Sequence, residues 1–302
     1  LEDWKKEEID KLLEVSKDET EYESFLRRYA GYMMRGSLGF GSKGKMDNGA
    51  FYISPTTAAT VLKTTPEKYE AVAVKVAEGD MSGITKLKST KISFNAETVT
   101  EIVETENILG YLEGTDKKDE LIILTAHYDH VGIDGDKVFN GADDDGSGTT
   151  SILELAEAYI TAAKAGKGPR RSILFMTVTG EEKGLLGSYY YTENPIFPLE
   201  NTVVNLNIDM VGRTDDAHKD NREFVYLVGS DRLSTELHEL SEKANETYTK
   251  LSLDYTYNDE DHPDRIYYRS DHWNFAKNNV PIIFYFNGTH EDYHRETDTV
   301  DK

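Results

Sequence analysis

The chain has 302 residues, of which 56 are acidic and 34 are basic, so its formal net charge is −22. This charge disfavours a nucleic-acid partner, because phosphate contacts need clusters of lysine and arginine. The absence of cysteine excludes disulfides, thiolate zinc sites and a cysteine nucleophile. An apolar fraction of 38% fits a globular protein, and no stretch approaches the roughly 20 apolar residues that a membrane span needs.

The first 85 residues are expected to form a smaller, helical segment. Apolar positions recur at helical spacing over residues 2–34, and five glycines between Gly36 and Gly49 indicate a loop. Ser54-Pro55 and Thr65-Pro66 each predict a helix start, because proline favours the first helical position. Between Lys86 and Gly114 the pattern changes to β-branched alternation, which predicts paired strands.

The remaining residues alternate between strand and helix patterns. Strands are expected at 121–126, 172–178, 202–210, 223–228 and 281–286, and helices at 147–165, 184–191 and 233–248. This alternation predicts an α/β domain over residues 86–302 with a mostly parallel central sheet flanked by helices. Ligands of such sheets gather at the carboxyl ends of the strands.

Acidic and imidazole side chains recur at these carboxyl ends. They are His127 and Asp129 after the first strand, Asp143 to Asp145 before its helix, Glu181 and Glu182 after the second, Asp209 in the third, and His294 after the last. Each one alone is usually a solvated turn or a helix cap. Asp209 is harder to explain in that way, because an ionised carboxylate inside an apolar strand is costly unless it is paired or metal-bound. Together these residues predict a divalent metal held by nitrogen and oxygen.

Six ordered motifs make residues 86–302 resemble the co-catalytic zinc aminopeptidase family, which includes bacterial leucyl aminopeptidases, glutamate carboxypeptidases and glutaminyl cyclases. The motifs are AHYDHVG, NGADDDGSG, TGEEKGLLGS, NIDMVG, SDHWNF and the terminal YHRETDTVDK. The segment around Phe51 to Pro55 resembles the end of a protease-associated insert domain found in some bacterial members. Such members carry helices before the insert that we do not find here, so we expect the chain to be incomplete at its start. A secreted or periplasmic location is also expected, and the absence of cysteine is compatible with it.

The resemblance implies two Zn²⁺ ions per chain. His127 and Asp209 are expected to bind one ion, Glu182 and His294 the other, and Asp144 to bridge both. Asp129 lies two residues after His127 and could orient its imidazole. Asp143 and Asp145 are expected to shape or cap the loop.

Glu181 is the expected general base, because it adjoins a ligand without being one. Tyr293 either donates a hydrogen bond to the tetrahedral oxyanion or packs beside the site, and both interpretations stay open. Asp271 is expected to lie behind the ligands or to anchor a substrate amine. We expect His272 to be a packed structural residue, and the remaining histidines have no motif support as ligands. These are His130, His218, His238, His262 and His290.

The leading hypothesis is a zinc-dependent exopeptidase, most simply an aminopeptidase that acts on peptides. A carboxypeptidase or dipeptidase stays open, because Arg213, Arg265 or Arg269 could bind an α-carboxylate. A glutaminyl cyclase with one zinc and a non-enzymatic binding module are further alternatives. The oligomeric state and the residue preferred at the cleaved end are left open.

Overall fold

The computed structural model describes residues 55–88, 90–92, 102–259 and 261–302, and the chain divides into two compact units between Ile102 and Val103. The first unit contains the helices α3 (Pro55–Val61) and α4 (Pro66–Ala77) and the 3₁₀ helix η1 (Met81–Lys86). Thr65 caps α4 by accepting a hydrogen bond from the backbone N–H of Lys68. The two helix starts expected from Pro55 and Pro66 are therefore confirmed, while the helices expected over residues 2–34 lie outside the described residues.

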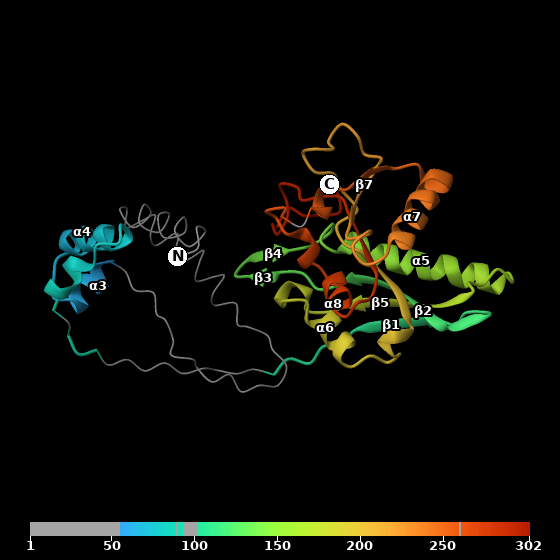
Figure 1. The fold of residues 1–302 in the computed structure, drawn as a ribbon, viewed down its shortest axis with the longest axis horizontal. Coiled ribbons are helices and arrows are strands. Elements are labelled where there is room, and N and C mark those ends of the chain that lie inside the picture. The colour runs from blue at the N-terminus through green and yellow to red at the C-terminus, as the bar shows by residue number, and fades with distance from the viewer. Residues whose placement is uncertain (1–54, 89, 93–101, 260) are drawn as a thin grey trace. The chain divides into compact units, whose positions relative to one another are not determined.

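The second unit is built on a seven-stranded sheet with the strand order β1-β5-β2-β6-β9-β7-β8 (Figure 1). The strands are β1 (Ile108–Leu112), β2 (Lys117–His127), β5 (Arg171–Val178), β6 (Thr202–Ile208), β7 (Phe224–Val228), β8 (Ser252–Asp254) and β9 (Ile282–Phe286). The central strands β5, β2, β6 and β9 run parallel to one another. Antiparallel pairing joins β1 to β5 and β7 to β9. The expected mostly parallel sheet is confirmed.

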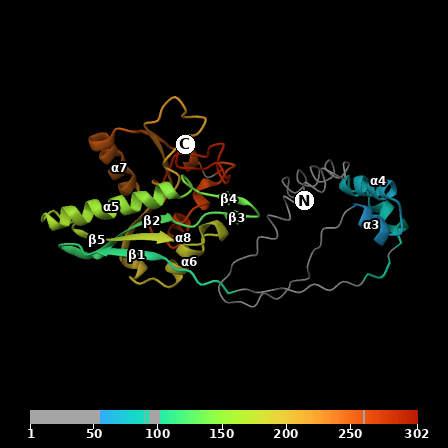
Figure 2. The same ribbon diagram turned by 180° about the vertical axis from the view of Figure 1, so that it is seen from behind.

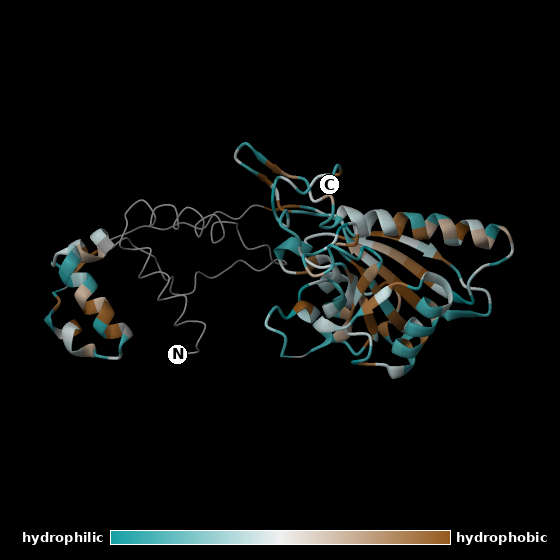
Figure 3. Ribbon diagram, turned by 90° about the horizontal axis from the view of Figure 1, so that it is seen from above, coloured by the Kyte–Doolittle hydropathy of each residue, from teal (hydrophilic) through white to brown (hydrophobic). Residues whose placement is uncertain are grey.

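Helices cover both faces of this sheet. In Figures 1 and 2, α5 (Gly146–Lys164) and α7 (Thr235–Ala244) lie on one face, and α6 (Leu186–Glu193) and α8 (His272–Ala276) lie on the other. Adjacent side chains of β2 point to opposite faces, so Ile123 packs with residues of α6 and α8 while Leu124 packs with residues of α5. Figure 3 shows the resulting apolar strands at the centre of this unit. Within the described part of the chain, no helix combines the length and the apolar character that crossing a membrane requires.

Some elements differ from the expectation. The loop between Asp129 and the aspartate triplet contains a hairpin of β3 (Gly132–Asp134) and β4 (Lys137–Phe139), which turns at Gly135 with a φ of 60°. The short edge strand β8 was also not expected. Of the strands expected between Lys86 and Gly114, the structure contains β1, and residues 93–101 lie outside its described part. Helix α7 ends at Ala244 and continues as a π-helical turn over Asn245–Thr249.

The sheet register brings the carboxyl ends of the central strands together. His127 at the end of β2 pairs with Val178 of β5, and Thr125 pairs with Asn207 of β6. Ile208 of β6 pairs in turn with Tyr285 of β9. The segments that follow these strands therefore meet at one edge of the sheet.

Candidate metal centre

His127, Asp144 and Asp209 form a first set of converging side chains. Nε2 of His127 lies 3.3 Å from Oδ1 of Asp144 and 3.6 Å from Oδ1 of Asp209. The other ring nitrogen, Nδ1, lies 2.9 Å from the backbone carbonyl oxygen of Asp129. Because a carbonyl oxygen only accepts, Nδ1 carries a proton, and in the neutral ring the lone pair of Nε2 faces the two carboxylates.

A buried polar chain fixes the carboxylate of Asp209. The hydroxyl of Ser270 donates to Oδ2 of Asp209 at 2.7 Å and accepts from the side-chain amide of Asn207 at 2.9 Å. The hydroxyl of Thr125 on β2 donates to the amide oxygen of Asn207 at 2.6 Å. With Oδ2 bonded to Ser270, Oδ1 of Asp209 has no hydrogen-bond partner and faces His127.

Asp144, Glu182, His294 and His130 form a second set. Nε2 of His294 lies 3.1 Å from Oδ2 of Asp144 and 3.2 Å from Oε1 of Glu182. Nδ1 of His130 lies 3.0 Å from Oε1 of Glu182 and 3.7 Å from Oδ2 of Asp144. The two oxygens of Asp144 therefore face different sets, which is the arrangement of a bridging carboxylate.

His130 is a site residue that the sequence analysis missed. Its only sequence signal is its place three residues after His127 in the same motif, and a surface histidine gives the same signal. In the structure its ring is mostly buried beside Glu182, and it forms a metal-sized cluster with Asp144 and Glu182.

The donor atoms of these two sets fit a divalent metal. Oδ2 of Asp144, Oε1 of Glu182, Oδ1 of Asp209 and both ring nitrogens of His130 are buried without a hydrogen-bond partner among the described residues. Such orphaned atoms are rare in native proteins, and neighbouring carboxylates disfavour each other's ionised form. A cation that accepts nitrogen and oxygen ligands satisfies these atoms and neutralises the carboxylates, and Zn²⁺ is one such cation.

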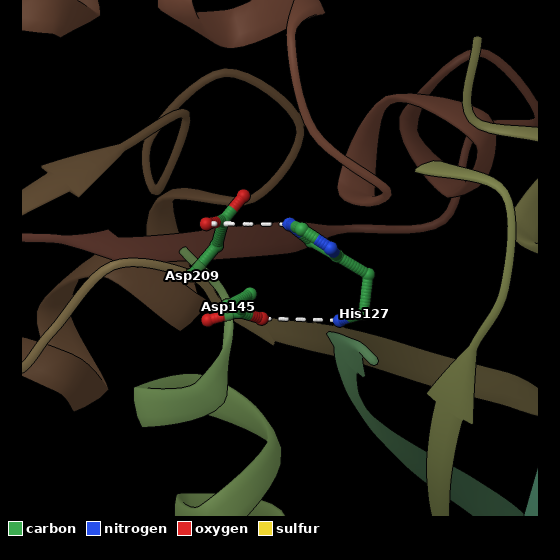
Figure 4. A group of neighbouring side chains, drawn as sticks. All are labelled: His127, Asp145 and Asp209. Atoms are coloured by element: carbon green, nitrogen blue, oxygen red, sulfur yellow. Dashed lines mark hydrogen bonds and ion pairs between the residues drawn. The ribbon is translucent and has the colours of Figure 1, made fainter. Parts of the chain in front are cut away.

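The third aspartate of the triplet, Asp145, stands near His127 and Asp209 but is already bonded. Its carboxylate accepts the backbone N–H groups of Gly148 at 2.9 Å, His127 at 3.0 Å and Met210 at 3.2 Å. In Figure 4 the Asp145 carboxylate meets the backbone of His127, whereas Asp209 faces the imidazole. Asp145 therefore caps α5 and ties three segments together.

Two further aspartates hold the triplet loop. Asp143 accepts the backbone N–H of Gly212 at 2.7 Å. Asp298, which is fully buried, accepts the N–H groups of Asp143 at 3.1 Å and of Asp144 at 3.2 Å. Asp298 lies in the terminal motif, but it was not predicted from the sequence as a site residue.

Asp129 orients the site in two ways. Its carboxylate accepts the backbone N–H groups of Glu181 at 3.0 Å and Glu182 at 3.3 Å, so it positions the glutamate pair. Its carboxylate stands 3.9 Å from Nδ1 of His127, and its backbone carbonyl makes the closer contact that orients the ring. The sequence suggested that the side chain of Asp129 orients His127. In the structure the backbone carbonyl of Asp129 makes the orienting contact.

Glu181 lies beside the first set without belonging to it. Its Oε2 is 3.9 Å from Nε2 of His127. Burial raises the pKa of Glu181 well above its usual range, and the carboxylates of Asp271 and Asp209 raise it further against the opposing effect of His127. A buried carboxyl group next to the donor atoms is suited to proton transfer.

Asp271 and His272 lie deeper in the fold. Both are fully buried, and Asp271 is not among the residues that line the pocket described below. Burial raises the pKa of Asp271 to about 7. Nε2 of His272 lies 2.7 Å from the carbonyl of Tyr267, and burial lowers its pKa to about 3. Such a position suits Asp271 as a group behind the site rather than as an anchor for a substrate amine.

An open pocket reaches the first set of donors. It is lined by His127, Asp144, Glu181, Asp209, Met210, Ile266, Arg269, Ser270, Phe284, Phe286, Thr289, Tyr293 and His294. The ring of Tyr293 stacks on the imidazole of His294 with 3.9 Å between centroids, and its hydroxyl lies 3.5 Å from a guanidinium nitrogen of Arg269. The pocket therefore combines an acidic donor cluster, an apolar wall and one guanidinium group.

The three arginines considered for carboxylate binding have different surroundings. Arg269 lines the pocket. Arg213 is paired with Asp292 at 2.8 Å, and the guanidinium of Arg265 lies over the ring of Tyr268 at 4.8 Å. Arg269 alone among these three is placed to meet a substrate.

Comparison with known proteins assigns the chain to a family. Residues 107–302 match the model of peptidase family M28. The chain belongs to this family. The relationship to the zinc aminopeptidases that the motifs predict is confirmed at the level of the family.

Curated relatives carry both aminopeptidase and carboxypeptidase names. Aminopeptidase YwaD from Bacillus subtilis is 32% identical over 143 residues, which cover 47% of this chain and 28% of the relative. A probable glutamate carboxypeptidase from Arabidopsis thaliana is 31% identical over 159 residues, covering 52% and 21%. A vacuolar membrane protease from Kluyveromyces lactis is 34% identical over 136 residues, covering 44% and 14%. The chain thus spans less than a third of the length of these relatives in each match.

Solved structures support the fold. The zinc aminopeptidase BSAP from Bacillus subtilis superimposes with a TM-score of 0.51 at 27% identity, covering 65% of this chain and 44% of that one. LapB from Legionella pneumophila gives a TM-score of 0.51 at 24% identity, covering 65% and 49%. The second likeness concerns the fold alone.

Proposed function

We propose that the chain is an aminopeptidase that hydrolyses the first peptide bond of peptides with the help of two zinc ions. One observation carries this proposal: Asp144 divides its two oxygens between two sets of donor atoms, four of which are buried without a hydrogen-bond partner among the described residues. Membership of family M28 and the likeness to zinc aminopeptidases support the same function.

Each residue of the site has a role in this reaction. When bound, two zinc ions lower the pKa of the attacking water and polarise the scissile carbonyl. Glu181 takes a proton from the water and passes it to the leaving amine, and its distance of 3.9 Å from His127 supports this role. Tyr293 lines the same pocket and donates a hydrogen bond to the developing oxyanion.

The pocket supports an apolar residue at the cleaved end of the substrate. Met210, Ile266, Phe284 and Phe286 line it beside the donor cluster. Burying a large apolar side chain there contributes about 1.5–3 kcal/mol of binding free energy. We therefore propose a preference for N-terminal leucine or phenylalanine over charged residues.

A carboxypeptidase or dipeptidase is the second candidate. Arg269 in the pocket matches an α-carboxylate, because a guanidinium group binds a carboxylate through two parallel hydrogen bonds. A one-zinc glutaminyl cyclase and a binding module without metal are the remaining alternatives, and metal analysis separates both from a two-zinc peptidase.

A panel of substrates tests this function. Aminoacyl-chromophores that begin with leucine, phenylalanine, lysine or glutamate are compared with their N-acetylated forms, with N-acylated dipeptides and with N-terminal glutamine peptides. We expect cleavage of the free leucyl and phenylalanyl substrates, loss of cleavage on N-acetylation, and loss on chelation with recovery on zinc addition. Cleavage of only the N-acylated dipeptides would indicate a carboxypeptidase instead of an aminopeptidase. A secreted or periplasmic location stays a prediction, and the relatives include vacuolar membrane proteases.

A further inference from the structure

We propose that His130 is a fourth protein ligand in the second set, so that the two metal positions are unequal. One position then has four protein ligands, His130, Asp144, Glu182 and His294, while the other has three, His127, Asp144 and Asp209. This inference rests on the proposed two-zinc function and adds to it one further ligand and a difference between the two metal positions.

The donor atoms of the second set are spaced like the corners of a tetrahedron. Zinc bonds of about 2.0–2.1 Å to nitrogen and oxygen place neighbouring ligand atoms about 3.3 Å apart in a tetrahedral site. From Oε1 of Glu182, Nδ1 of His130 lies at 3.0 Å and Nε2 of His294 at 3.2 Å. From Oδ2 of Asp144, the same two nitrogens lie at 3.7 Å and 3.1 Å. His130 thus lies near the ligand spacing, although His294 matches it more closely.

The surroundings of His130 favour a metal ligand over a residue that only orients Glu182. Nδ1 of His130 approaches the carboxylates of Glu182 and Asp144, and both ring nitrogens are buried without a hydrogen-bond partner that meets geometric criteria in the described part of the chain. The ring also packs on the loop that carries Asp144. A Cβ at Gly141, where φ is +64°, would lie 2.5 Å from Cγ of His130. The imidazole is therefore held in place with a free nitrogen directed at two carboxylates.

The first set is open by comparison. All three of its residues line the pocket together with Glu181, whereas only Asp144 and His294 of the second set line it and His130 and Glu182 do not. Asp145, the other acid near His127, already accepts three backbone N–H groups. Structural zinc sites have four protein ligands, and catalytic zinc sites have three ligands and an open position. The His127 set, with three protein ligands, accordingly leaves more room for water and the substrate carbonyl than the His130 set, with four.

Metal affinity tests this assignment through His130→Gln, with His238→Gln on α7 as the matched control. His238 contacts Ser230 at 2.9 Å and belongs to neither donor set. Zinc is titrated into the stripped full chain in competition with a chromophoric chelator, which separates two binding constants. In His130→Gln we expect the tighter constant to weaken more than about 100-fold, beyond the 10–100-fold typical of losing a residue behind a ligand. The looser constant and the control should not change. A smaller loss, or a loss confined to the looser constant, would overturn the proposal.

Cobalt(II) loading gives a second readout that does not depend on activity. Imidazole N–H protons of ligating histidines give strongly shifted, solvent-exchangeable proton resonances next to Co(II). The wild-type chain should show one more such resonance than His130→Gln, and the buried ring of His130 should protect its proton from rapid exchange. An equal number of resonances in both would overturn the ligand role even where affinity falls. Circular dichroism of His130→Gln, together with the same measurements on a second variant, His130→Asn, distinguishes the loss of a ligand from misfolding.

These results separate the inference from the proposed function. A wild-type chain that binds two zinc ions and cleaves peptides, with His130→Gln unchanged in both constants, refutes the His130 role alone. A wild-type chain that binds zinc but cleaves no peptide refutes the proposed function, while the cobalt resonances still decide whether His130 is a ligand.

Discussion

Replacing Glu181 by glutamine removes a base while keeping a side chain of the same size. The backbone bond from residue 181 to Asp129, 3.0 Å long, is unaffected by this change. The carboxylate of Glu181 lies 3.9 Å from Nε2 of His127 and outside both donor sets, so metal binding should be retained. Burial raises the pKa of Glu181, which means that the ionised form is disfavoured there. The neutral amide therefore should not destabilise the fold.

The expected effect of Glu181→Gln is a lower kcat. A positioned general base contributes a factor of about 10²–10⁴ to the rate. This factor corresponds to about 2.7–5.4 kcal/mol of transition-state stabilisation, since each tenfold change in rate is about 1.36 kcal/mol. Glu181 accepts the proton only as the reaction proceeds, so kcat should fall by this factor while KM changes little.

Steady-state hydrolysis of a leucyl chromophore, with elemental analysis of the same samples, measures both quantities. Glu193→Gln on the exposed end of α6 is the matched control, because it removes the same charge away from the site. Full turnover in Glu181→Gln would refute the role of this residue as base. Loss of turnover together with loss of zinc would instead move Glu181 into the ligand set.

The remaining predictions concern the bridge, the pocket tyrosine and pH. Asp144→Ala should lower the zinc content after gel filtration from two to one or fewer per chain, and an unchanged content would contradict the bridging role. Tyr293→Phe keeps the stacking on His294 but removes the hydroxyl, so kcat should fall by roughly 10²–10³; an unchanged kcat would assign Tyr293 to packing. Burial disfavours protonated His294, but Asp144 and Glu182 outweigh it and raise its pKa to about 9 in the metal-free chain. Protonated His294 therefore stabilises that fold below pH 6.5, and this contribution is lost as pH rises through 9. The melting temperature of the chelated chain should fall over this window, and a rise would contradict the interpretation.

Much of the fold could be predicted because the change from period-two to helical patterning is strong in this chain. The run ending at Leu124 is apolar on both faces because helices cover both sides of β2, as a buried parallel strand requires. The β3–β4 hairpin could not be predicted in the same way. Its strands have three residues each, which is too short for a period to be recognised, and Ile133 and Val138 are exposed rather than buried.

The site residues that lie at a strand end could be predicted from the sequence. The site residues whose position depends on the packing of a loop could not. His127 ends β2 and Asp209 directly follows the neighbouring parallel strand β6, so the topology alone brings them together. His130 reaches Glu182 only because its loop folds over Gly141, and no local pattern records that contact. Asp298 accepts the backbone N–H of Asp143, which lies 155 residues away in the sequence. A backbone N–H does not depend on the side chain of its residue, so no sequence pattern predicts this contact.

Zinc titration of the metal-stripped chain, followed by leucyl-substrate hydrolysis at each point, measures whether Asp144 serves two metals. Two zinc ions should bind per chain, and hydrolysis should reach its maximum only as the second position fills. Saturation at one zinc per chain, or hydrolysis that persists in the stripped protein, would contradict the two-metal site.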